Sequence, residues 1–83
     1  MTSAGLRETV MELVADRVEV DAAVNIDSRL VEDLGLDSLA RAELWVAVEE
    51  AFDCRIPDRD AEQLTSVAGI VDYLRSIGIA SAG

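Results

Sequence analysis

Apolar residues recur at helical spacing in three separate segments of this 83-residue chain, and this periodicity constrains its fold more than any other feature. The segments cover about residues 4–17, 38–52 and 67–77, and only a short turn of helix fits between 58 and 64. Amphipathic helices can bury one another without a sheet. The pattern therefore predicts an all-α fold, a four-helix bundle with three main helices and one short helix.

The connection between the first two main helices is long and has no sustained helical period. It covers residues 18–36, and the chain offers no second β-rich run with which a strand here could pair. Loops of this length in compact domains are usually either functional or disordered. We predict an ordered crossover, because several apolar side chains are available to anchor it: Val24, Ile26, Leu30, Leu34 and Leu36.

The second main helix is predicted to bury a stripe formed by Leu39, Leu44, Val48 and Phe52. Trp45 shares this stripe or borders it, so a place in the core or at its edge is expected. If the Phe52 ring is central to the core, its truncation to alanine costs about 3–5 kcal/mol.

Capping residues predict where two of the helices begin and end. Asp37 is a suitable N-cap for the second main helix, because its carboxylate can accept hydrogen bonds from the first free backbone N–H groups. Thr65 or Ser66 is expected to cap the last helix. Gly78 is placed to end that helix.

The length, charge and cysteine content exclude several classes of protein. We predict a single domain over residues 1–83, with a core of about 4–77 and a flexible tail at 78–83. Seventeen acidic and seven basic residues give a net charge of −10, which argues against nucleic-acid binding and against adsorption to anionic membranes. The single cysteine, Cys54, cannot form an internal disulfide. With no signal-peptide pattern or 18-residue apolar run, this favours a cytoplasmic location.

The residue types present do not favour catalysis. The chain has no histidine, which excludes a Ser-His-Asp triad, a histidine general base and a histidine-ligated metal. The acidic pairs Glu32–Asp33 and Asp58–Asp60 lack the spacing of a calcium loop, so no metal site is expected. No lysine, histidine or helix N-terminus adjoins Cys54, so a structural role is expected for its thiol. We expect a protein that is not an enzyme.

Residues 33–39 carry the most information about function. If Asp37 caps the helix, Ser38 lies in the first helical turn, and its hydroxyl is not required for capping. A helix N-terminus presents free N–H groups and a partial positive charge, so a phosphate ester on Ser38 would occupy a favourable anion site. Gly35 permits the close turn that precedes this helix start. Two alternatives are an ordinary capping serine and a nucleophilic serine in a Gly-x-Ser-x-Gly elbow. The second fails because residue 40 is alanine and no histidine exists.

The motifs around Ser38 resemble those of the acyl carrier protein family. Residues 34–39, Leu-Gly-Leu-Asp-Ser-Leu, match the motif in which a serine receives 4′-phosphopantetheine from coenzyme A. The resemblance covers roughly residues 6–77. It implies that Ser38, flanked by Asp37 and Leu39, bears an arm whose thiol carries acyl groups as thioesters. Further matches follow one another in order along the chain, at residues 30–35, 43–44, 48–52, 56–57, 64–67 and 72–74.

The resemblance also implies a docking surface on the second main helix, since acyl carriers use this acidic helix to bind basic patches on their enzymes. Glu43 and Glu50 are two turns apart and therefore share a face. Val46 lies off the buried stripe and is a candidate exposed contact. Arg41 departs from the family's acidic pattern and favours a carrier with dedicated partners. An ordinary solvated face is the alternative. The predicted docking residues are Arg41, Glu43, Val46, Glu49 and Glu50.

Together these features give the expected function. We expect a monomeric acyl carrier of polyketide or related secondary-metabolite biosynthesis. Its partners would be a phosphopantetheinyl transferase and the enzymes that load and process acyl groups. A carrier of fatty-acid synthesis and a peptidyl or aminoacyl carrier of a nonribosomal pathway are the alternatives of the same class. An acidic helical interaction subunit that is never modified is the alternative of another class.

Overall fold

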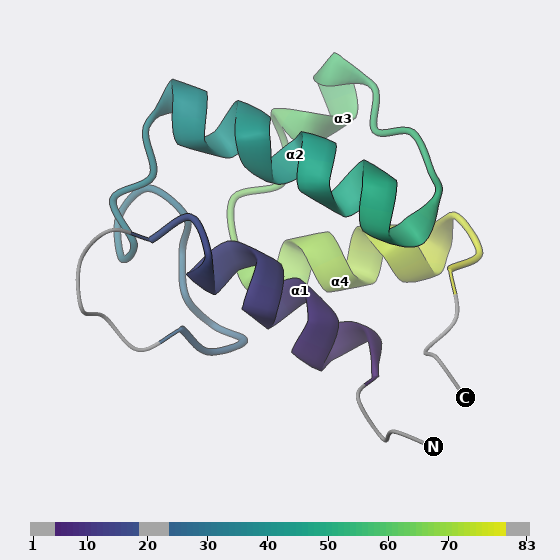
Figure 1. Ribbon diagram of the computed structural model, residues 1–83, viewed down its shortest axis with the longest axis horizontal. Coiled ribbons are helices and arrows are strands. Elements are labelled where there is room, and N and C mark those ends of the chain that lie inside the picture. The colour runs from purple at the N-terminus through teal and green to yellow at the C-terminus, as the bar shows by residue number, and fades with distance from the viewer. Residues whose placement is uncertain (1–4, 19–23, 80–83) are drawn as a thin grey trace.

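The computed structural model describes residues 5–18 and 24–79, and this part of the chain contains four helices and no strand (Figure 1). The all-α prediction is therefore confirmed. The helices are α1 (Leu6–Ala15), α2 (Ser38–Phe52), α3 (Asp58–Ala61) and α4 (Val67–Ser76).

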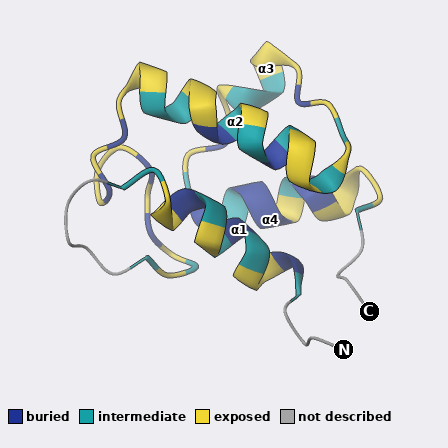
Figure 2. Cartoon of the chain, viewed as in Figure 1, coloured by how far each residue is buried: buried dark blue, intermediate teal, exposed yellow. Residues whose placement is uncertain are grey.

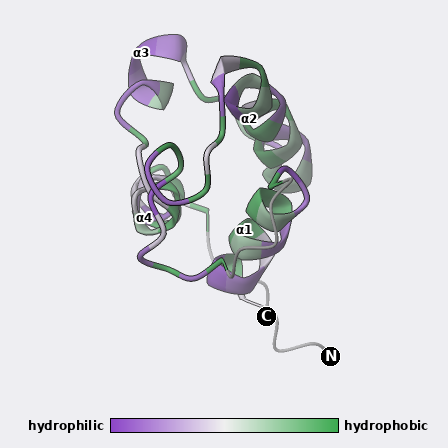
Figure 3. Cartoon of the chain, turned by 90° about the vertical axis from the view of Figure 1, so that its left-hand side faces the viewer, coloured by the Kyte–Doolittle hydropathy of each residue, from purple (hydrophilic) through white to green (hydrophobic). Residues whose placement is uncertain are grey.

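The core lies between the three longer helices, because α1 packs against both α2 and α4. Figure 2 shows buried residues on the faces that these helices turn toward one another. The short helix α3 buries no residue and is mostly hydrophilic in Figure 3. The buried apolar residues come from all three longer helices and from the connections: Leu6, Val10, Val14, Leu30, Leu34, Leu36, Leu44, Val48, Ile56, Leu64, Val67, Ile70, Val71 and Leu74.

The first helix is shorter than the segment predicted at residues 4–17. It ends at Ala15, and residue 4 lies outside the described residues. The backbone N–H of Arg17 donates to the Val14 carbonyl at 2.9 Å, three residues back. This bond tightens the last turn, as is common where an α-helix ends.

The second helix has the predicted bounds, but its buried stripe is narrower than expected. Leu44 and Val48 are fully buried, whereas Leu39 is 68 % exposed. Leu39 and Leu44 are five residues apart, which places them about 140° apart around the helix. Phe52 is only half-buried, because it is the last residue of α2 and packs at the edge of the core. Trp45 packs against the core, as predicted.

The described part of the crossover loop, residues 24–36, is bonded to the start of α4. Residues 19–23 of the predicted crossover lie outside the described residues. Backbone bonds join Ser28 O to Val67 N–H (3.0 Å), Ile26 O to Ala68 N–H (2.9 Å) and Thr65 O to Leu30 N–H (2.9 Å). Two of these bonds satisfy amides at the beginning of α4 that have no partner within the helix. An isolated antiparallel bridge between Arg29 and Ser66 accompanies them. The loop is thus ordered by its backbone as well as by its apolar side chains.

The ends of α4 follow the predicted caps. Of the two candidates, Ser66 is the N-cap, and its hydroxyl accepts a hydrogen bond of 3.0 Å from the backbone N–H three residues on. Gly78 has a φ of +97°, a conformation that favours glycine after a helix. Ile79 donates to the Leu74 carbonyl at 2.9 Å and packs against the core. The first two residues of the predicted tail therefore belong to the folded domain, and residues 80–83 lie outside the described part.

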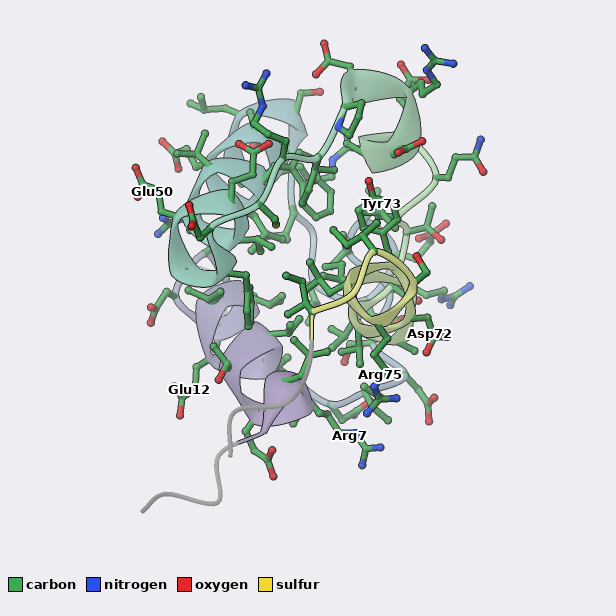
Figure 4. The ribbon with its side chains drawn as sticks, turned by 90° about the vertical axis from the view of Figure 1, so that its right-hand side faces the viewer. Arg7, Glu12, Glu50, Asp72, Tyr73 and Arg75 are labelled. Carbon is green, nitrogen blue, oxygen red and sulfur yellow. The ribbon has the colours of Figure 1, made fainter. Side chains whose placement is uncertain are left out.

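Two side-chain hydrogen bonds attach the short helix α3 and the segment before it to the rest of the fold. The Tyr73 hydroxyl donates to an Asp60 carboxylate oxygen at 2.8 Å, and Figure 4 shows Tyr73 on the side of α4 that faces α3. The Ile56 backbone N–H donates to Glu49 Oε2 at 2.7 Å. Ala61 of α3 also packs against the core, although no residue of α3 is fully buried.

We expect Tyr73→Phe to lower the free energy of unfolding by about 0.5–1.5 kcal/mol at pH 7, the value of one hydrogen bond. Burial, and then the bond to Asp60, raises the pKa of Tyr73 above its usual value. Because the pKa of Tyr73 is higher in the folded than in the unfolded state, its protonated phenol stabilises the fold at pH values below the unfolded pKa of about 10. This contribution to the free energy of unfolding is lost as the pH rises through the folded pKa. Denaturant unfolding at pH 7 and pH 11 should therefore give a smaller difference between the two proteins at pH 11. A difference independent of pH would contradict this account.

Candidate functional site

Ser38 is the first residue of α2, and its hydroxyl is not used to cap the helix. Asp37 caps it instead, as predicted, because Asp37 Oδ1 accepts a hydrogen bond of 2.8 Å from the Ala40 backbone N–H. Ser38 itself is exposed. An accessible hydroxyl therefore lies at the positive end of a helix dipole, where an attached anion would be stabilised.

Arg41 extends its guanidinium back toward the start of α2. Its terminal Nη2 lies 3.4 Å from Ser38 Oγ, and its Nε lies 3.4 Å from the Asp37 carbonyl oxygen, both in donor geometry. We predicted Arg41 only as a docking residue, and its proximity to Ser38 was missed. The signal was present, since residues three apart on a helix are neighbours.

The chain that leads to Ser38 is held in one conformation by local bonds. Asp33 Oδ2 accepts from the Arg29 backbone N–H at 2.8 Å and from Arg29 Nε at 3.3 Å. The backbone bond, followed by the side-chain bond, lowers the pKa of the Asp33 carboxyl. Gly35 then adopts a φ of +68°, as the predicted close turn requires. Leu34 and Leu36 on either side are buried, so the turn is anchored to the core.

A hollow of about 290 Å³ opens beside Ser38, between α2 and α3. Three charged residues line it: the cation Arg41 from α2, and the carboxylates of Asp58, the first residue of α3, and Glu62, which follows α3. The residues that line it are Ser38, Arg41, Ala42, Trp45, Asp58, Ala61 and Glu62.

The exposed face of α2 combines apolar and acidic side chains. Val46 is 52 % exposed, as predicted for a residue off the buried stripe. Glu43 and Glu50 are also exposed and line one hollow together with Val46, so the predicted shared face is observed. Figure 4 shows Glu50 pointing away from the body of the protein. Glu49 differs, because it is half-buried and its carboxylate accepts the Ile56 N–H.

Cys54 has the character expected of a structural thiol. It is half-buried and packs against the core. Burial raises its pKa, and the nearby carboxylates of Glu49 and Asp53 raise it further. A raised pKa keeps the sulfur protonated and weakly nucleophilic at neutral pH.

Comparisons with known proteins identify the family of this small helical domain. Residues 8–74 match the family model described as "Phosphopantetheine attachment site". An acyl carrier protein of Campylobacter curvus is 43 % identical over 72 residues, which cover 86 % of this chain and 94 % of that protein. One from Akkermansia muciniphila is 40 % identical over 78 residues, covering 93 % and 98 %.

A solved structure is also similar. It is a Mycobacterium tuberculosis chain described as a candidate acyl carrier protein, with a TM-score of 0.78 and 26 % sequence identity. The match covers 87 % of this chain and 97 % of that one. The chain belongs to the acyl carrier protein family.

Membership of this family establishes the general role of the protein. It is a carrier and not a catalyst, and it bears a covalently attached phosphopantetheine group. Acyl carrier proteins are modified by a phosphopantetheinyl transferase and interact with acyl-processing enzymes. Within the described residues, no helix is both long enough and apolar enough to cross a membrane.

Proposed function

We propose that Ser38 is the residue to which 4′-phosphopantetheine is attached, with Asp37 and Leu39 flanking it. The observation that carries this proposal is the exposed Ser38 hydroxyl at the first position of α2, which Asp37 frees from capping. The serine oxygen would attack the pantetheine phosphorus of coenzyme A, so that the new phosphodiester forms as the pyrophosphate bond breaks, 3′,5′-ADP leaves and the serine hydroxyl loses its proton. We propose further that residues 1–83 form a single carrier domain.

The surroundings of Ser38 fit this group. The first amides of α2 and the Arg41 guanidinium supply positive charge beside the oxygen that would bear the phosphate. The hollow between α2 and α3 leaves space next to it. When bound, the group supplies a terminal thiol that carries acyl chains as thioesters. The chain's own contribution is to hold the attachment oxygen in the open at a fixed helix start.

Intact-mass measurement tests the proposal directly. The apo protein is incubated with coenzyme A and a promiscuous phosphopantetheinyl transferase, and it should gain the mass of one arm. Tandem mass spectrometry should then locate the added mass on Ser38. An acidic interaction subunit that is never modified would gain no mass under conditions that load a known carrier.

We also propose that the exposed face of α2 is the docking surface, formed by Leu39, Glu43, Val46 and Glu50. An enzyme that reaches an arm on Ser38 has to approach this helix, and the face offers carboxylates around two exposed apolar side chains. Arg41 lies at the margin of this surface. We leave Glu49 out of it, because its carboxylate holds the segment before α3.

We expect the double variant Glu43→Lys/Glu50→Lys to be modified about tenfold more slowly at low salt, because charge complementarity steers the encounter with a basic enzyme. The rate of mass gain at 20 mM and 1 M NaCl measures the effect. The difference should shrink at 1 M, where the Debye length falls to about 3 Å.

The matched control is Glu12→Lys/Asp72→Lys, which changes the net charge equally at exposed positions of α1 and α4 (Figure 4). It should be modified at nearly the parent rate. Equal slowing of both double variants would show that only the total charge matters, and would contradict a docking surface on α2.

For the pathway, we propose polyketide or related secondary-metabolite biosynthesis in the cytoplasm, with dedicated partner enzymes. Arg41 supports this, since it places a positive charge beside the attachment serine on an otherwise acidic helix. Loading assays on the modified protein separate an acyl carrier from a peptidyl carrier. Transfer of acyl groups from acyl-coenzyme A by acyltransferases would support an acyl carrier, while loading by an adenylate-forming amino-acid enzyme would indicate a peptidyl carrier.

A further inference from the structure

The position of Arg41 indicates a role toward the arm itself, and this inference rests on the proposed attachment at Ser38. We propose that the Arg41 guanidinium binds the phosphodiester on Ser38 and holds the beginning of the arm against α2. Arg41 would then be a positioning residue for the arm, in addition to lying at the margin of the docking surface.

Geometry provides the first support. Arg41 Nη2 is already 3.4 Å from Ser38 Oγ, the atom that would become a phosphodiester oxygen. The unesterified oxygens of that phosphate lie two bonds further on, within reach of the same guanidinium. The contact from Arg41 Nε to the Asp37 carbonyl keeps the side chain folded toward the helix start. A planar guanidinium with several N–H donors suits the geometry of phosphate oxygens.

The charge balance of α2 provides the second support. A cation near a helix N-terminus is unfavourable, since that end carries partial positive charge. The first turn of α2 contains no acidic residue, and no carboxylate of the described residues lies within ion-pair distance of Arg41. Arg29, by contrast, pairs with Asp33 at 3.3 Å. Arg41 therefore makes no direct ion pair in the described part of the chain, and an anion on Ser38 would supply one.

The neighbouring carboxylates indicate on which side of the hollow the phosphodiester would lie. Asp58 and Glu62 line the hollow beside Ser38 from the side of α3, and Asp37 lies just before it. All three repel a phosphodiester. Arg41 is the only cation that lines this hollow in the described part of the chain. The phosphodiester should therefore lie on the Arg41 side of the hollow, away from α3.

The test compares the apo and loaded forms of the parent, Arg41→Gln and Arg75→Gln. Arg75 is an exposed arginine in the last turn of α4, which lies on the opposite side of the molecule from the start of α2 (Figure 1), and its replacement removes the same charge. Excess transferase is used, and complete loading is verified by mass, so that slower modification of a variant does not affect the result. The melting temperature and the ³¹P NMR spectrum are then measured at low salt.

For each protein, the melting temperature of the apo form is subtracted from that of the loaded form. This difference should be about 1–5 °C larger in the parent and in Arg75→Gln than in Arg41→Gln. The ³¹P resonance should also shift in Arg41→Gln and stay in place in Arg75→Gln. Complete loading with equal temperature differences and an unmoved resonance in Arg41→Gln would overturn the role of Arg41 and leave the attachment at Ser38 standing. An arm located on another residue would overturn both.

Discussion

Replacement of Ser38 by alanine is expected to abolish incorporation of the arm while leaving the protein folded. The side chain is exposed and does not cap α2, so the change removes the one oxygen that we propose for attachment and no buried contact. The free energy of unfolding should stay within about 0.5 kcal/mol of the parent, as is usual for surface substitutions. Intact mass after incubation with transferase and coenzyme A measures the first effect, and denaturant unfolding measures the second.

Ser76→Ala is the matched control, because Ser76 is also an exposed serine on a helix. It should gain one arm as the parent does. If Ser38→Ala gained the same mass, the attachment site would lie elsewhere. If Ser38→Ala were unfolded, the absence of the arm would not identify the attachment residue. Unfolding is therefore measured on the same samples.

The largest loss of stability is expected from Leu44→Ala, at about 2–5 kcal/mol. Leu44 is fully buried on the face of α2 that packs into the core, so truncation removes apolar contacts and leaves a cavity. Total stabilities of small domains are about 5–15 kcal/mol, so such a loss is a large fraction of the whole. Urea unfolding followed by circular dichroism measures it.

Leu39→Ala makes the same chemical change on the same helix at a position that is 68 % exposed. It should change the free energy of unfolding by no more than about 0.5 kcal/mol. Phe52→Ala should fall between the two leucine variants, since its ring is half-buried at the end of α2. Similar losses for Leu39→Ala and Leu44→Ala would contradict the orientation of α2.

Features set by short-range chemistry could be predicted from the sequence. The Asp37 cap and the bounds of α2 follow from a side chain that can reach amides two and three residues on. The left-handed turn at Gly35 likewise depends on the residue itself. The exposed position of Ser38 follows from the Asp37 cap, because one side chain is enough to cap the N-terminus of α2 and the Ser38 hydroxyl is not needed for it.

Features set by the tertiary fold could not be predicted in this way. The bond from Ile56 N–H to Glu49 joins residues seven apart across a loop, and no helical periodicity contains it. Phe52 was expected in the buried stripe of α2 because its spacing fits that stripe. Spacing gives the side of a helix that a residue occupies, but it does not say where the neighbouring helix ends. The pairing of Ser28 with Val67 depends in the same way on where α4 lies.

The backbone bonds between the crossover loop and the start of α4 have a consequence for the biosynthesis of this carrier. Residues 65–68, which hold that loop in place, are synthesised after Ser38 has been added to the chain. On the ribosome, residues 26–30 of the loop therefore lack these backbone partners until the later segment has emerged and folded. The complete packing around α2 must then follow translation of α4, and we expect unfinished chains to be poorer substrates for the transferase than the folded domain.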